Sequence, residues 1–220
     1  DVLVAGRSLA KARAFCADQP RLTPVAIDRA AVAAALRDHR PAVLVDASGP
    51  FQTLDYTIPA ACVAAGVHYV DIADARAFVC GIVTLDAAAK AAGVVVISGA
   101  SSVPALSGAV VRKLAVGFEQ VRAVEMAISA SNRTTAGPAV AAAILAQLGQ
   151  PLKLWRGRRW IERIGWQELR REHFVVAGER PLDRRLVALV DVPDHELLPE
   201  RLPGRPAVTF RAGTELGFQT

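Results

Sequence analysis

The first residues of the chain that could do chemistry follow a short apolar run. Residues 2–5 are Val-Leu-Val-Ala, which is typical of a buried strand, and Gly6, Arg7 and Ser8 come directly after them. At such a strand tip in a dinucleotide-binding fold, a carboxylate accepts from the adenosine 2′-hydroxyl, whereas an arginine accommodates a 2′-phosphate. This tip carries a cation and a hydroxyl donor and no carboxylate. We therefore predict that Gly6, Arg7 and Ser8 bind a cofactor, with NADP favoured over NAD.

A second interpretation of this segment stays open, in which residues 2–5 are a first strand followed by an ordinary turn. The next expected strand, residues 22–28, ends in Asp28. Its carboxylate can accept from an adenine amine, which would make Asp28 a cofactor contact. It can equally well cap the helix that follows, because aspartate is a preferred N-cap residue.

The third expected strand, residues 42–48, ends in a segment suited to lie along a nucleotide. Ser48 is followed by Gly49, which lets the backbone approach a ligand closely, and by Pro50, which stiffens the turn. The ring of Phe51 can then pack on a ribose or a nicotinamide. We predict all four as cofactor-binding residues. The alternative is an ordinary tight turn with a buried aromatic side chain.

The most polar of the central strands, residues 68–72, contains Tyr69 and Asp71. Alternation along a strand puts these two side chains on one face. A carboxylate at the carboxyl end of a parallel strand can accept a proton or orient a substrate. We therefore predict Asp71 as the catalytic residue and Tyr69 as a substrate contact. Asp71 could instead cap a loop or pair with Arg76.

Two further segments carry residues suited to an anionic substrate. Ser101 and Ser102 precede the helix expected from Pro104, where unpaired backbone N–H groups and two hydroxyls suit a carboxylate or a phosphate oxygen. The same serines could simply cap that helix. Asn132 and Arg133 follow the first strand of the second half, and a guanidinium can grip a carboxylate bidentately. The alternative for Arg133 is an exposed loop arginine.

A parallel sheet would position these side chains, because the first half alternates strands and helices with short connections. The strands are largely continuous apolar runs, which is typical of a sheet covered on both faces. We predict the α/β class, with a Rossmann-like doubly wound parallel sheet over residues 1–117. Its usual first strand and glycine-rich turn are missing from the chain, so we expect an N-terminal piece to be absent.

The second half, residues 118–220, has a different pattern. A long β-rich segment at 121–129 and a helix at 139–148 precede a hairpin around Gly157 and several short strands. We predict an α+β domain with a mostly antiparallel sheet, used for substrate binding and dimerisation. The arginine- and tryptophan-bearing hairpin favours a homodimer.

Composition excludes several classes of function. Hydrophobic residues make up 52% and charged residues 21%, which is typical of a globular protein. The 26 Lys and Arg against 21 Asp and Glu form no basic tail or basic-aromatic stripe, so we expect no nucleic-acid partner. No apolar run approaches the roughly 20 residues that span a bilayer, and there is no signal-peptide pattern, so we expect a cytoplasmic protein without a membrane partner. The three cysteines and four histidines have no metal-ligand spacing, so we expect no metal.

The order and spacing of four segments resemble the saccharopine dehydrogenase-like family, and more narrowly its saccharopine reductase-type NADP-binding branch. The likeness covers residues 2–115, and its segments are Ala5-Gly6-Arg7-Ser8, Val45–Phe51, Ala61–Asp71 and Ser98–Ser107. The resemblance implies a Rossmann domain, an α/β domain for substrate binding and dimerisation, and a nicotinamide-dependent step at a carbon–nitrogen bond of an amino acid.

Carried over by position, the resemblance implies that Arg7 and Ser8 meet the adenosine 2′-phosphate and that Asp28 lies near adenine. Gly49, Pro50 and Phe51 would lie along the ribose and nicotinamide. The predicted function is therefore an NADP-dependent oxidoreductase that acts on a carbon–nitrogen bond of a small, amino-acid-like substrate. The alternative is a non-catalytic dimeric protein that keeps the Rossmann scaffold for nucleotide sensing or partner binding. It is favoured by the lack of a histidine or lysine at an obvious strand end.

Overall fold

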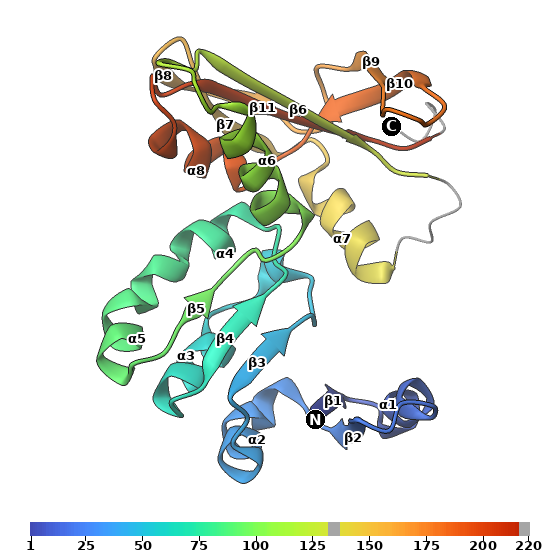
Figure 1. Ribbon diagram of the computed structural model, residues 1–220, viewed down its shortest axis with the longest axis vertical. Coiled ribbons are helices and arrows are strands. Elements are labelled where there is room, and N and C mark those ends of the chain that lie inside the picture. The colour runs from blue at the N-terminus through green and yellow to red at the C-terminus, as the bar shows by residue number, and fades with distance from the viewer. Residues whose placement is uncertain (132–136, 216–220) are drawn as a thin grey trace. The chain divides into compact units, whose positions relative to one another are not determined.

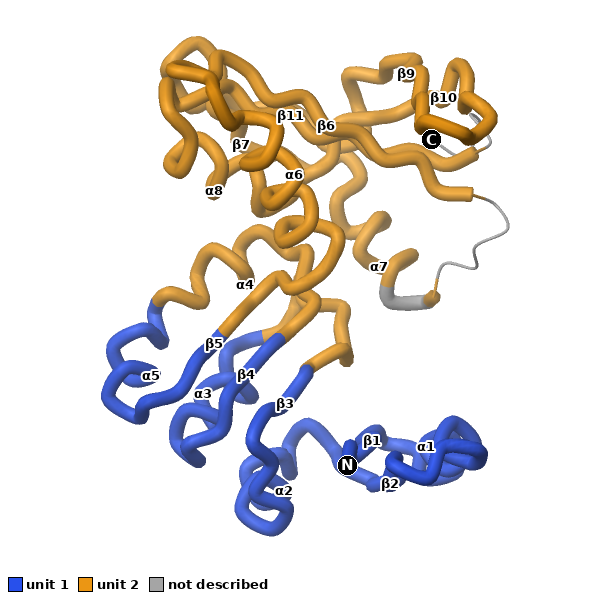
Figure 2. Tube along the Cα trace, viewed as in Figure 1, with its two compact units in different colours: residues 1–45, 55–70, 84–96 blue, residues 46–54, 71–83, 97–220 orange. Residues whose placement is uncertain are grey.

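The computed structural model describes residues 1–131 and 137–215, which form two compact units. Unit 1 contains residues 1–45, 55–70 and 84–96, and unit 2 contains residues 46–54, 71–83 and those from 97 onward (Figure 2). The division passes through the strands of one sheet, so that the carboxyl ends of three strands belong to unit 2. The domain division predicted near residue 117 stays a prediction.

Unit 1 begins with a parallel pair of strands joined by a helix. Strand β1 (Val2–Gly6) lies beside β2 (Leu22–Ala26), with Val2 opposite Leu22. Helix α1 (Leu9–Cys16) connects them. Ser8 is its N-cap residue, because the Ser8 side chain accepts a hydrogen bond from the Lys11 backbone N–H at 3.3 Å. This strand–turn–helix unit is the one expected from the sequence.

A second sheet has the strand order β3-β4-β5 (Figure 1). Its strands run in parallel, because the His68 N–H donates to the Ala42 carbonyl and the Ile72 N–H donates to the Asp46 carbonyl further along. The strands are β3 (Val43–Asp46), β4 (His68–Asp71) and β5 (Val96–Ile97), and the helices of this region are α2 (Val32–His39), α3 (Thr57–Ala64), α4 (Arg76–Gly81) and α5 (Asp86–Ala92).

The parallel pairing predicted for the first half is confirmed, and the chain is of the mixed α/β class. The five strands nevertheless form two sheets rather than one, because no described strand hydrogen-bonds to both β1 and β3. The core of unit 1 packs side chains of α2 and α3 against β4. Its buried side chains are Val32, Leu36, Ile58, Cys62, Val67 and Tyr69.

Unit 2 contains a four-stranded sheet with the order β6-β11-β10-β9. Strand β10 (Leu182–Leu189) runs antiparallel to β9 (Arg170–Phe174) and to β11 (Ala207–Gly213). Strand β6 (Ala123–Ser129) runs parallel to β11 along its whole length (Figure 1). Two of the three strand pairings are antiparallel, so the predicted mostly antiparallel sheet is confirmed, and β6 with β11 is its parallel pair. A parallel neighbour that is remote in the chain leaves no turn signal in the sequence.

The predicted hairpin is confirmed as β7 (Pro151–Arg156) paired with β8 (Arg159–Ile164). The remaining helices of unit 2 are α6 (Ser107–Leu114), α7 (Pro138–Gln147) and α8 (Asp194–Arg201). Helices α6 and α8 pack on the sheet through one apolar cluster, formed by Val111, Val124, Leu198, Leu202 and Val208.

Candidate functional site

The turn between β1 and α1 lines a cavity of about 590 Å³ that carries two basic side chains. Its walls are Val4, Ala5, Gly6, Arg7, Ser8, Lys11, Ala12 and Phe15. A Cβ added to Gly6 would meet nothing within 4 Å, so the backbone there is open to a ligand. The three residues predicted at this strand tip therefore lie together around one cavity.

Electrostatics at this turn favour an anion. Arg7 and Lys11 are exposed, and their side chains pair with none of the described residues. The first turn of α1 contains no acidic residue. The N-terminus of a helix also presents unpaired N–H groups and the positive end of the helix dipole. These donors match the chemistry of a phosphate group.

Lys11 is absent from the predicted site residues. Its position in the first turn of the helix that follows Ser8 is the signal that could have found it, because the first turn of a helix carries the unpaired N–H groups that bind anions.

Two roles were predicted for Asp28, contact with adenine and capping of the next helix, and the structure shows the capping role. Its Oδ1 atom accepts a hydrogen bond from the Ala30 N–H at 3.0 Å, at the start of the short 3-10 turn Arg29–Ala31 that leads into α2. The side chain is exposed, and contact with adenine stays a prediction.

The segment after β3 is held by Asp46, which is 5% exposed. Its Oδ1 atom accepts from both the backbone N–H and the hydroxyl of Ser48. Phe51 is buried and packs against Phe78, with ring centroids 5.2 Å apart. The alternative of a turn with a buried aromatic side chain therefore matches these contacts. Contact of Phe51 with a ribose or nicotinamide stays a prediction that its burial does not favour.

Asp71 and Tyr69 are both fully buried, whereas His68 and Val70 are partly exposed, in agreement with the predicted alternation. The Oδ1 atom of Asp71 accepts three hydrogen bonds: from the Ala73 N–H at 2.9 Å, the Gly99 N–H at 2.8 Å and the Ser98 hydroxyl at 2.9 Å. Its Oδ2 atom has no partner among the described residues. Asp71 thus joins the loops after β4 and β5. Tyr69 lies in the core of unit 1.

Gly99 is required in this arrangement for two reasons. Its φ is +81°, and an added Cβ would lie 2.6 Å from Cδ of Pro104. We expect Gly99→Ala to lower the free energy of unfolding by about 2–4 kcal/mol, since a left-handed residue costs about 1–2 kcal/mol and overpacking adds a similar amount. Urea denaturation would measure the loss.

Gly93→Ala is the matched control, because Gly93 has a φ of +65° but open space around its Cβ position. We expect this variant to lower the free energy of unfolding by about 1–2 kcal/mol, because it adds backbone strain alone. Equal losses in the two variants would show that Pro104 imposes no constraint on Gly99.

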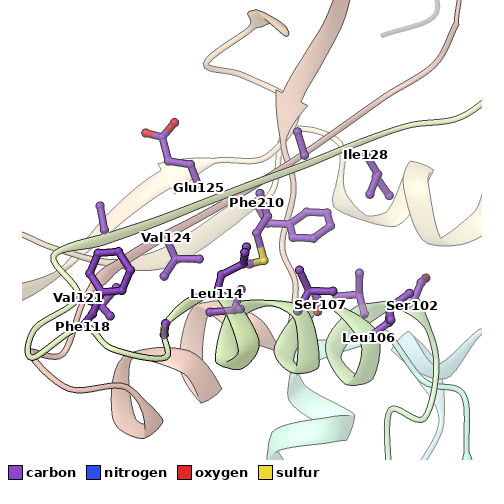
Figure 3. A pocket seen from close by; sticks show the side chains of 17 residues that line it. Ser102, Leu106, Ser107, Leu114, Phe118, Val121, Val124, Glu125, Ile128 and Phe210 are labelled. Atoms are coloured by element: carbon purple, nitrogen blue, oxygen red, sulfur yellow. The ribbon is translucent and has the colours of Figure 1, made fainter. Parts of the chain in front are cut away.

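Ser101 does not cap a helix with its side chain; its hydroxyl donates to the Val103 carbonyl at 2.9 Å. Ser102 lines a cavity of about 540 Å³. Figure 3 shows Leu106 and Leu114 from the α6 side and Val124 from the β6 side of this cavity, while the carboxylate of Glu125 points away from it. The walls are mainly apolar and offer no cation to an anionic substrate. Asn132 and Arg133 lie outside the described residues.

A cluster of ionic side chains in unit 2 was not predicted. Arg76, at the start of α4, forms ion pairs of 3.1 Å with both Asp191 and Glu196 and donates to the Lys153 carbonyl at 2.7 Å. The predicted alternative in which Arg76 pairs with Asp71 is therefore wrong. These partners lie more than 70 residues from Arg76 in the chain, so no local sequence pattern predicts the pairing.

His195 belongs to the same cluster and is fully buried. Its Nε2 atom accepts from the Phe210 N–H at 3.1 Å, so the proton of the neutral ring sits on Nδ1, which lies 3.6 Å from the Asp191 carboxylate. Burial lowers the pKa of His195 below its usual value of 6.5. The unfolded chain therefore binds a proton at a higher pH than the folded chain does.

We expect this histidine to make the protein less stable in mild acid. The contribution of neutral His195 to the free energy of unfolding is complete above pH 6.5. It decreases as the pH falls from there through the lower pKa of folded His195. Urea denaturation at pH 8 and at about pH 5.5 would measure the difference. His195→Gln should reduce it, whereas the exposed His39→Gln should not. An unchanged pH dependence in His195→Gln would contradict the assignment.

Residues 1–97 match the family model described as the saccharopine dehydrogenase NADP binding domain. This segment is therefore similar to a saccharopine dehydrogenase NADP-binding domain. The match confirms the predicted resemblance and supports NADP as the cofactor. Among the predicted site residues, only Ser101, Ser102, Asn132 and Arg133 fall outside this domain.

A search of curated proteins found no match to the chain. Among solved structures, the chain is similar to the protein yvaA of Bacillus subtilis, with 12% identity and a TM-score of 0.46, over 98% of this chain and 57% of that one. It is also similar to a dehydrogenase from Chromobacterium violaceum, with 15% identity and a TM-score of 0.47. That similarity covers 97% of this chain and 57% of the dehydrogenase. The chain thus spans little more than half the length of these proteins.

Within the part of the chain that the structure describes, no helix is long and apolar enough to cross a membrane. The described residues also contain no group of three His, Cys, Asp or Glu side chains that could hold a metal ion.

Proposed function

We propose that the chain is part of an NADP-dependent oxidoreductase that acts on a carbon–nitrogen bond of an amino-acid-like substrate. The observation that carries the proposal is the β1–α1 turn of a saccharopine dehydrogenase NADP-binding domain, with Arg7, Ser8 and Lys11 around one cavity. The family match supports an oxidoreductase, and the donors of this turn fit the 2′-phosphate that distinguishes NADP from NAD.

The chain's own residues would bind the cofactor and the substrate and hold the surrounding loops in position. Arg7 and Lys11 would hold the 2′-phosphate by charge-assisted hydrogen bonds. Asp71 would fix the loops after β4 and β5, since three donors from these loops converge on its Oδ1 atom. We assign Asp71 a positioning role for this reason. The nicotinamide cofactor supplies the hydride chemistry when it is bound. Residues 118–220 would bind the substrate and form a homodimer, with Arg133 holding a carboxylate.

A second candidate function is a non-catalytic protein that binds the nucleotide without turnover. The burial of Asp71 and Phe51 favours it, because neither side chain is exposed to a substrate.

Turnover distinguishes the two functions. NADPH consumption would be followed at 340 nm with pairs of 2-oxo acids and amines, beside NADPH binding measured by fluorescence titration. The oxidoreductase requires binding together with turnover of at least one pair. Binding without turnover of any pair would favour the second function, and absence of binding would contradict both.

A further inference from the structure

A cavity of about 600 Å³ in unit 2 contains none of the residues assigned to the cofactor. It is lined by residues from α4 and the turn that follows it, from the end of β5, and from α6 and α8. Most of its wall is aliphatic, with Ile82, Ile97 and Leu197 as examples. This size, with apolar walls and few polar groups, is typical of sites for small organic molecules.

One carboxylate in the wall of this cavity has an oxygen that the protein does not satisfy. Asp194 is fully buried. Its Oδ1 atom accepts from the Ser107 hydroxyl at 2.7 Å, whereas its Oδ2 atom has no partner among the described residues. Burial raises the pKa of Asp194 above its usual value. A buried polar atom without a hydrogen bond is costly, so a donor placed beside Oδ2 would be stabilising.

Two unpaired cations belong to the same cavity. Arg112 on α6 and Arg201 on α8 both line it, both are exposed, and the side chain of neither pairs with a described residue. Arg76, in contrast, is only 12% exposed and has two carboxylate partners. The cavity therefore combines an unsatisfied acceptor, apolar walls and two guanidinium groups.

We propose that this cavity binds a small amphipathic zwitterion, a molecule with an ammonium and a carboxylate on an apolar body. The ammonium would donate to Oδ2 of Asp194, and the carboxylate would accept from Arg112 and Arg201. The apolar body would lie against the aliphatic wall. The proposal does not depend on NADP, because its site shares no residue with the β1–α1 turn.

Three probes with the same aromatic body test the two polar contacts separately. L-Phenylalanine carries both groups, 3-phenylpropionate lacks the ammonium and 2-phenylethylamine lacks the carboxylate. Calorimetric titration of the whole chain without NADP would give the Kd of each. We expect L-phenylalanine to bind at least about tenfold more tightly than either of the others, since a hydrogen bond to a charged group is worth about 1.5 kcal/mol or more.

Two variants link the preferences to the cavity. Asp194→Asn keeps the acceptor for Ser107 and should remove the preference for L-phenylalanine over 3-phenylpropionate. The double variant Arg112→Gln with Arg201→Gln should remove the preference over 2-phenylethylamine. Lys113→Gln is the matched control, because Lys113 is the exposed neighbour of Arg112 on α6 and does not line the cavity.

Thermal unfolding would confirm that each variant is folded. The proposal is overturned if none of the probes binds at millimolar concentration, if L-phenylalanine has no advantage, or if both variants keep the preferences of the parent chain. Because NADP is absent from these titrations, their failure would leave the proposed oxidoreductase function intact.

Discussion

Replacing Arg7 by alanine is expected to raise the Kd for NADPH by about 10- to 100-fold, while the Kd for NADH stays the same within about twofold. NADPH and NADH differ only in the 2′-phosphate, so a residue that contacts only this group changes one affinity and not the other. The expected size follows from the loss of one charge-assisted hydrogen bond, about 1.5–3 kcal/mol. Fluorescence titration of both cofactors measures it.

Lys11→Ala should also raise the Kd for NADPH, but by a smaller factor. Lysine makes a single-point contact, whereas arginine can make two parallel hydrogen bonds. Arg13→Ala is the matched control, since Arg13 is also an exposed cation on α1 but does not line the cavity. If Arg7→Ala weakened NADPH and NADH equally, Arg7 would contact a part that the two cofactors share. If Arg7→Ala left both affinities unchanged, the assignment of the β1–α1 turn would be wrong.

The second large effect is expected at Asp71. Asp71→Ala should lower the free energy of unfolding by about 3–5 kcal/mol, because it leaves the N–H groups of Ala73 and Gly99 and the Ser98 hydroxyl without their acceptor. Asp71→Asn keeps one acceptor oxygen and should lose less, about 1–2 kcal/mol. Urea denaturation followed by circular dichroism measures both.

Asp74→Ala is the control for Asp71. Asp74 is an exposed carboxylate three residues later, with one hydrogen bond from the Gln52 side chain, and we expect a loss below about 1 kcal/mol. A loss in Asp71→Ala no larger than this would refute the positioning role. A folded Asp71→Asn protein that binds NADPH normally but lacks turnover would instead favour the catalytic role that the sequence predicts for Asp71.

Features that depend on near neighbours in the chain were predictable from the sequence. The β1–α1 turn is one, because an apolar run, a glycine and an N-cap serine follow one another within eight residues. The hairpin of β7 and β8 is another, since Gly157 lies between two short strands. The family match over residues 1–97 also agrees with a resemblance visible in the order of these local motifs.

Features that depend on remote pairing were not predictable in this way. The parallel pairing of β6 with β11, the ion pairs of Arg76 with Asp191 and Glu196, and the packing of Phe51 on Phe78 all join residues without a local signal. Burial was the second difficulty. Alternation places Tyr69 and Asp71 on one face but does not say whether this face meets a ligand or the core.

By itself the sequence determined the α/β class and the strand–turn–helix that carries Arg7 and Ser8. These follow from hydrophobic patterning and capping, which act over a few residues. Only the tertiary structure decided that Lys11 joins this turn, that Asp71 is enclosed by three donors, and that Asp194 shares a cavity with Arg112 and Arg201. The physical reason is that solvent exposure and hydrogen-bond partners are set by which segments pack together, and packing is a property of the whole chain.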